Sequence, residues 1–97
     1  MNKQKVSNLL GLAQRAGKII SGEEMVVKAI QDRKVKLVFL AHDASPNLTK
    51  KIQDKSHYYQ VEVITVFSTL ELSIAVGKSR KVLAVTDAGF TKKMRSL

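Results

Sequence analysis

A nearly unbroken apolar run from Val35 to Ala41 constrains the fold of this chain more than any other feature. It has the length of a strand and is rich in residues that favour β structure. Only Lys36 interrupts the run, so a strand formed here has apolar side chains on both of its faces. Such a strand is stable inside a sheet whose two faces are both covered. The run therefore predicts a central strand with helices packed on each side of the sheet.

Segments with helical spacing lie before this run. Apolar residues from Val6 to Ala13 recur at intervals of three and four, which predicts an amphipathic first helix that ends near Gly17. A second helix is expected after residue 22, with Val26, Ala29 and Ile30 as its buried face. Both helices expose their charged residues, so each is expected to cover the sheet with one side only.

The rest of the chain continues this alternation. Short runs rich in β-formers predict further strands near Ile19, from Val61 to Val66 and from Val82 to Val85. Three more helices are expected to begin at polar capping residues: Ser45 before Pro46, Ser68 in the capping box Ser68–Glu71, and Thr86 or Asp87. The order of elements predicts one domain, residues 1–97, of the α/β class. Its expected architecture is a three-layer α/β/α sandwich, a small mixed sheet with helices on both faces.

The transition from the strand near Ile20 to the second helix has the composition of an anion site. Ser21 and Glu24 have the spacing of a capping box, in which each side chain accepts a hydrogen bond from the backbone of the other. Gly22 leaves the backbone uncovered where free N–H groups and the positive end of the helix dipole point outward. Lys28 lies one turn beyond Glu24 on the same face. Backbone donors, carboxylates and an ammonium group are therefore expected within a small area.

The charge of the chain points to a polyanionic partner. Its 17 Lys and Arg residues exceed 8 Asp and Glu residues, which gives a net charge of +9 and a sequence pI near 10.1. The first twenty residues carry basic charges and no acidic ones, and basic residues gather again at 78–81 and 92–95. Nucleic acid is the first candidate, and an acidic protein or an anionic membrane remains open.

Composition excludes several other classes of site. The chain has no Cys, so it forms neither a disulfide nor a thiolate zinc site. The isolated His42 and His57 do not make a metal site. No apolar run approaches the roughly 20 residues of a membrane span, and the polar first residues lack the apolar core of a signal peptide. A cytoplasmic protein with no metal, no cofactor and no membrane partner is expected.

Catalytic motifs are also missing. His42, Asp43 and Ser45 follow one another at a predicted strand end, where neighbouring residues rarely converge as a triad, and no Gly-x-Ser-x-Gly elbow is present. Phosphate-binding glycine loops of the Gly-x-Gly-x-x-Gly and Walker kinds do not occur. The chain is therefore not expected to be an enzyme, and Asp43 is expected to cap or brace the turn that follows it.

Segments along nearly the whole chain match the pattern of a known family: Leu10–Ala16, Ser21–Glu24, Val26–Lys28, Leu37–Ser45, Asp54–Lys55, Tyr58–Tyr59, Gly77–Lys78 and Ala84–Phe90. In these segments the chain resembles the ribosomal L7Ae family of kink-turn RNA-binding proteins, and most closely its small bacterial YlxQ-like branch. The resemblance implies an α/β/α sandwich that binds RNA without catalysis.

The resemblance also implies where RNA would bind. Members of the family place a Gly-x-Asn-Glu-x-x-Lys segment in the major groove of a sharply bent RNA, against tandem sheared G·A pairs. Gly22 and Lys28 match the ends of that segment, whereas Glu24 replaces the usual Asn and Met25 the usual Glu. A carboxylate in place of an amide removes a donor and repels phosphate. A different or less strictly defined RNA is therefore expected.

A second contact of the family, a largely apolar loop over extruded nucleotides, corresponds to Lys78–Lys81, which is basic here and favours phosphate. The sequence thus predicts a monomer that recognises a kink-turn-like or ribosomal structured RNA. The ribosome is one expected partner. The predicted RNA-binding residues are Arg15, Lys18, Gly22, Glu23, Glu24, Lys28, Lys78, Ser79 and Arg80.

Several alternatives stay open. A purely structural cap explains Ser21 and Glu24 without a ligand, and a solvated helix end explains Arg15 and Lys18 as well as RNA contact does. Tyr58 and Tyr59 either stack on bases or anchor a helix end to the core. The alternative function is a protein-interaction module that docks on an acidic partner in the ribosome or the translation machinery.

Overall fold

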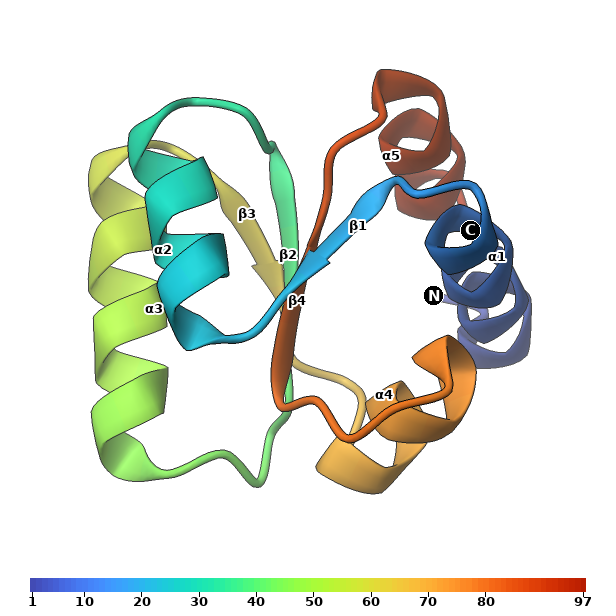
Figure 1. Cartoon of the computed structure of the whole chain (residues 1–97), viewed down its shortest axis with the longest axis horizontal. Coiled ribbons are helices and arrows are strands. Elements are labelled where there is room, and N and C mark those ends of the chain that lie inside the picture. Colours follow the sequence, from blue (N-terminus) through green and yellow to red (C-terminus); the bar gives the residue numbers. More distant parts are fainter.

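Four short strands form one mixed sheet, and helices cover both of its faces in the computed structural model, which describes residues 1–97 (Figure 1). The helices are α1 (Lys3–Arg15), α2 (Glu23–Gln31), α3 (Pro46–Tyr58), α4 (Thr69–Val76) and α5 (Ala88–Arg95). The strands are β1 (Ile19–Ser21), β2 (Leu37–Leu40), β3 (Glu62–Ile64) and β4 (Val82–Val85). Helices α2 and α3 lie on one face and α1, α4 and α5 on the other, so the predicted three-layer sandwich is confirmed.

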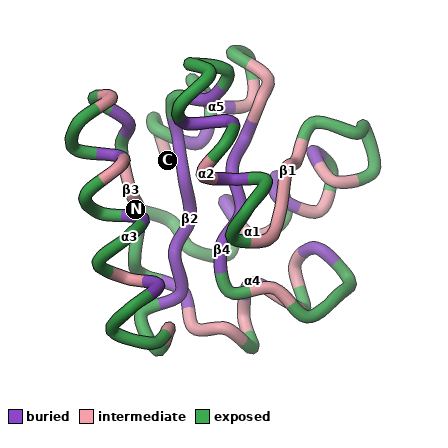
Figure 2. Tube along the Cα trace, turned by 60° about the vertical axis from the view of Figure 1, so that its left-hand side comes forward, coloured by how far each residue is buried: buried purple, intermediate pink, exposed green.

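The strand order is β1-β4-β2-β3, and β4 is antiparallel to both of its neighbours while β2 and β3 are parallel. The prediction that the run around residues 35–41 forms a central strand is confirmed, because β2 lies between β4 and β3. Strand β3 is shorter than the expected 61–66, since only three of its residues pair with β2. Both β2 and β4 are buried along their whole length (Figure 2).

Side chains of β2 alternate between two cores on opposite faces of the sheet. Leu37 and Phe39 belong to the core beneath α1, α4 and α5, whereas Val38 and Leu40 belong to the core beneath α2 and α3. The alternation follows from the two-residue period of a strand. A single strand of this sequence therefore supplies apolar side chains to both halves of the molecule.

The predicted buried faces of the first two helices are confirmed. In α1 the residues from Val6 to Ala13 with helical spacing are buried, and Gly17 follows the helix with a positive φ of 73°. In α2 the buried residues are Val26, Ala29 and Ile30. None of the helices is long and apolar enough to cross a membrane.

Three of the predicted caps are present. The Ser45 hydroxyl accepts from the Leu48 amide at 3.2 Å. In α4 the Glu71 amide donates to the Ser68 hydroxyl at 3.1 Å and the Ser68 amide to the Glu71 carboxylate at 2.9 Å, so this capping box is complete. Asp87, rather than Thr86, caps α5. The Thr86 amide and hydroxyl instead both donate to the Lys18 carbonyl.

The Asp43 carboxylate connects the loop before α3 to the start of α4. Its Oδ1 accepts from the Thr69 amide at 2.9 Å and from the Thr69 hydroxyl at 2.7 Å. Asp43 was expected to brace its own following turn. In the structure the carboxylate instead braces the first turn of α4, through both hydrogen bonds from Thr69.

Acid should destabilise the start of α4. Hydrogen bonds from the side chain and backbone of Thr69 hold the pKa of Asp43 below its ordinary value of 3.8. The Ser68 backbone N–H and then the Lys3 ammonium lower the pKa of Glu71 below 4.5. Carboxylates with a lowered folded-state pKa stabilise the fold well above pH 4.5, and this contribution is lost as the pH falls through the lowered values. Urea unfolding at several pH values should show a weaker acid dependence for Asp43→Asn than for the parent.

Asp32→Asn is the matched control for that titration, because the Asp32 side chain makes no hydrogen bond or ion pair. Equal acid dependence in the parent and in Asp43→Asn would contradict the assignment.

Candidate nucleic-acid interface

Helix α2 begins at Glu23 with Gly22 as its N-cap residue, and no side chain caps it. Gly22 has φ 94° and ψ 150°, a backbone conformation that L side chains rarely adopt. The predicted capping box of Ser21 and Glu24 is therefore wrong. Ser21 is still part of β1, where it pairs with Leu83 of β4, so the helix cannot start at Ser21.

The Ser21 hydroxyl has a different partner. It accepts a hydrogen bond of 2.8 Å from Nε of Arg80, which lies in the basic loop (Lys78–Lys81) between α4 and β4. The same loop is held from its other side, because the Arg80 amide donates to the Ser73 hydroxyl of α4 at 3.0 Å. Arg80 Nη1 donates to the Ser79 carbonyl at 2.7 Å, and Nη2 has no partner within the chain. The basic loop is thus fixed beside the start of α2 with N–H donors to spare.

A shallow hollow joins these two parts of the chain. Its lining comes from the end of β1 and start of α2, from the basic loop, and from the first turn of α3. The structure therefore brings together four of the predicted residues, Gly22, Glu23, Ser79 and Arg80. It adds Lys81, which belongs to the predicted basic loop but not to the predicted RNA-binding residues.

The two carboxylates at the start of α2 differ in their surroundings. Glu23 forms an ion pair of 2.9 Å with Lys51 of α3. Glu24 is exposed and makes no hydrogen bond or ion pair. Both stabilise the positive end of the helix dipole. Only Glu24 keeps an unbalanced negative charge where a phosphate would approach.

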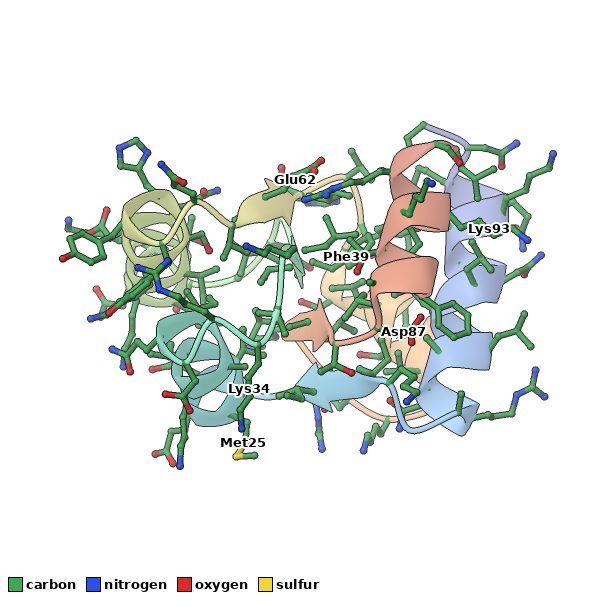
Figure 3. All side chains as sticks on the ribbon, turned by 90° about the horizontal axis from the view of Figure 1, so that it is seen from above. Met25, Lys34, Phe39, Glu62, Asp87 and Lys93 are labelled. Carbon is green, nitrogen blue, oxygen red and sulfur yellow. The ribbon has the colours of Figure 1, made fainter.

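Lys28 lies on the exposed face of α2, opposite the buried Ala29 and Ile30, and forms no ion pair. It lies five positions after Glu23, a rise of about 7.5 Å along the helix axis. The exposed Met25 points outward from the same helix (Figure 3). Lys28 is therefore exposed on the same helix but is not part of the lining of the hollow.

The remaining predicted residues lie further away. Lys18 precedes β1, at the opposite end of this strand from Gly22. Its carbonyl accepts a hydrogen bond from Thr86, which follows β4. Arg15 lines a groove between α1 and α4 that reaches Gly77. Lys78 lies beside Leu70 and Ile74 of α4. Of these three cations, Lys78 begins the basic loop, Arg15 lies in the groove next to it, and Lys18 lies apart from both.

The charge of this surface is left largely uncompensated within the chain. Only four of the 17 Lys and Arg residues form ion pairs, namely Lys3, Lys50, Lys51 and Arg95. Most acidic side chains are occupied in these pairs or at the start of α4 and α5. Free cations are therefore available to an anionic partner.

The sequence analysis missed one exposed apolar pair. Leu70 and Ile74, four residues apart on α4, are 68% and 71% exposed. Tyr58, for which base stacking and core anchoring were both left open, is 76% exposed at the end of α3. The apolar pair could have been found from the composition of α4, which is apolar around its whole circumference.

The triad considered in the sequence analysis is not formed. Asp43 is bound to Thr69, and the Ser45 hydroxyl caps α3. No group of three His, Cys, Asp or Glu side chains is arranged to hold a metal ion. The chemistry of the surface is that of hydrogen-bond donation and positive charge.

Comparison with known proteins gives the family. The model of the ribosomal protein L7Ae/L30e/S12e/Gadd45 family matches residues 4–95. The chain belongs to this L7Ae family. The resemblance stated from sequence is thereby confirmed, and so is the expectation that the chain is not an enzyme, since the L7Ae family is non-enzymatic.

Relatives within the L7Ae family are close. RNA-binding protein YlxQ of Enterococcus faecium is 50% identical over 96 residues, 99% of this chain and 93% of the relative. RNA-binding protein YlxQ of Bacillus subtilis is 50% identical over 90 residues, 92% of this chain and 90% of the relative.

Solved structures of similar proteins agree with the L7Ae fold. A protein of unknown function from Bacillus halodurans has a TM-score of 0.90 and 45% identity, with 95% of this chain and 94% of that chain covered. The Giardia lamblia 15.5kD RNA binding protein has a TM-score of 0.84 at 18% identity, with 96% and 81% covered, and this shows the shared fold alone.

Proposed function

We propose that this protein binds structured RNA through the start of α2 and the basic loop. The observation that supports this most directly is the hydrogen bond between Arg80 and Ser21, which holds a guanidinium group beside the uncapped helix end at Gly22. The two YlxQ relatives at 50% identity are described as RNA-binding proteins. Geometry and family therefore support the same class of ligand.

The start of α2 supplies donors that suit a phosphate. The amides of residues 23–25 have no acceptor within the chain, because the first turn of a helix lacks carbonyl partners and Gly22 has no side chain. Such amides bind anions, and the helix dipole adds to the attraction. Arg80 and Lys81 at the hollow and Lys28 on the exposed face of α2 neutralise further phosphates.

We further propose that the RNA is sharply bent, as in a kink-turn or a ribosomal RNA element. Gly22 and Lys28 match the family segment that enters the major groove. Glu24 and Met25 depart from it, so base contacts at these positions should differ from those of a G·A-specific protein. We also propose that the protein acts as a monomer, on free RNA or on the ribosome. A cytoplasmic location agrees with the lack of Cys.

A second candidate function is docking on an acidic protein. It is favoured by the exposed Leu70 and Ile74, which adjoin Lys78 and the groove that contains Arg15. Apolar side chains rimmed by cations suit an acidic amphipathic segment. A partner recovered by pull-down after ribonuclease treatment would favour this function over RNA binding.

Lys28→Ala should weaken RNA binding by roughly 1–3 kcal/mol if the ammonium group reaches a base edge. The RNA is first identified by crosslinking and sequencing, and its dissociation constant is then measured by filter binding beside that of a kink-turn RNA. Lys93→Ala on α5 is the matched control, because Lys93 lies on the far side of the molecule from Met25 of α2 (Figure 3). Equal dissociation constants for the parent and Lys28→Ala would remove Lys28 from the site.

A further inference from the structure

A stripe of aromatic and charged side chains runs along the outer face of α3. Lys51, Asp54, Lys55, Tyr58 and Tyr59 are spaced by three and four residues, so they share one face of the helix, and they line a shallow hollow. This tyrosine stripe is separate from the hollow at Gly22. We propose that it binds a single-stranded segment of RNA by stacking a base on Tyr58.

The two tyrosines are held in different ways. Tyr59 is half-buried at the end of α3, and the Arg33 guanidinium lies 5.3 Å from the centre of its ring. The Tyr58 ring lies 4.8 Å from that of Tyr59, centre to centre, at 74°, yet Tyr58 is 76% exposed. Tyr59 is thus fixed between the core and a cation, and it supports a Tyr58 ring that remains open to solvent. An exposed ring braced from behind is a platform on which a base can stack.

The charges around Tyr58 suit a nucleic acid backbone. Neither Lys55 nor Arg33 forms an ion pair, and Arg33 contacts only the ring of Tyr59 through its charge. The one acid of the stripe, Asp54, is neutralised by Lys50 at 2.9 Å. The stripe offers no aliphatic side chain of the kind that anchors a protein partner, since its apolar surface comes from tyrosine rings. Cations beside an aromatic platform favour a single strand over an acidic protein.

The stripe also continues the proposed RNA site. The ion pair between Glu23 and Lys51 joins the start of α2 to the stripe. Helices α2 and α3 run side by side from there, and Lys51 and Tyr58 are about 10 Å apart along α3 (Figure 1). An RNA strand that leaves the hollow at Gly22 can follow α3 to Tyr58. The identity of the natural ligand, a strand of the structured RNA, therefore rests on the proposed function. The stacking of a base on Tyr58 does not depend on it.

Intrinsic fluorescence tests the stacking directly. Tyr58 and Tyr59 are the only tyrosines of the chain, and it has no Trp, so all of its tyrosine emission comes from the stripe. Single-stranded oligouridylate should quench this emission on binding, after correction with a parallel titration of free tyrosine amide. Anisotropy of labelled oligouridylate gives the affinity. Tyr58→Ala should weaken that affinity roughly 5- to 100-fold, and Tyr58→Phe should retain it because a phenyl ring still stacks.

Two controls separate this proposal from the previous one. The double variant Lys28→Ala, Arg80→Ala should lose structured RNA but still bind oligouridylate at the stripe. If it loses neither, the proposed function fails while the stacking stands. Oligouridylate that does not quench, or that binds Tyr58→Ala as tightly as the parent, overturns the stacking whatever the structured RNA does. Competition by polyglutamate at the same concentration would show instead a surface for acidic proteins, and would also overturn it.

Discussion

Salt should release RNA from this protein steeply. Four unpaired cations, Lys28, Lys78, Arg80 and Lys81, lie at or beside the start of α2 and the basic loop. Each neutralised phosphate contributes about 0.7 to 0.9 to the slope of log affinity against log salt, so four contacts give a slope of about −2.8 to −3.6. Affinity should then fall roughly 50- to 150-fold between about 50 mM and 200 mM salt. Filter binding of the crosslinked RNA over this range measures the slope.

Single variants sharpen the same measurement. Replacing Lys28, Lys78 or Lys81 by Ala should make the slope shallower by about 0.7 to 0.9 in each case. The reason is that each replacement removes one phosphate contact and the counterion that it releases. Lys93→Ala on α5 should leave the slope unchanged. A salt response that is flat in the parent, or equally steep in every variant, would mean that these cations do not contact phosphate.

Loss of the Phe39 ring should cost more stability than any surface change. Phe39 is fully buried, and its ring lies 5.8 Å from that of Phe67 in the core beneath α1, α4 and α5. Truncation of a buried Phe to Ala typically costs about 3–5 kcal/mol. The whole free energy of unfolding of a domain of this size is only about 5–15 kcal/mol. Phe39→Ala should therefore lose a large part of the free energy of unfolding, measured by urea denaturation.

Two further variants calibrate that loss. Phe39→Leu keeps most of the buried volume, so its free energy of unfolding should lie between those of Phe39→Ala and the parent. Ile74→Ala removes a side chain that is 71% exposed and should change the free energy of unfolding by no more than about 0.5 kcal/mol. Equal losses from Phe39→Ala and Ile74→Ala would contradict the described packing. Retained RNA binding in folded Ile74→Ala would also separate the two candidate functions.

Identical local patterns show what sequence can and cannot predict. Ser68–Glu71 and Ser21–Glu24 share the spacing of a capping box, and only the first forms one. At Ser68 the chain is free to turn into the helix, so local chemistry decides. At Ser21 the residue is paired within the sheet and its hydroxyl is taken by Arg80, 59 residues further along the chain. A partner at that distance leaves no signal in the local sequence.

Predictions that depend on periodicity succeeded for a related reason. The buried faces of α1 and α2 and the position of β2 follow from apolar spacing, which is a local property with a global consequence. The candidate site depends on side chains from separate elements, such as Glu23 with Lys51 or Ser21 with Arg80. Local chemistry and family resemblance both indicated Gly22 and Lys28, and the fold was needed to place Arg80 and Lys81 beside Gly22.

The position of β4 has a consequence for how the molecule is made. This strand is the last of the four to leave the ribosome during synthesis, yet it lies between β1 and β2, which do not pair with each other. A nascent chain that stops short of residue 82 can dock β2 on β3, but β1 has no neighbour to join. Gly22 and Arg80 therefore meet only when β4 inserts, and nascent protein should be unable to engage RNA until this strand has left the ribosome.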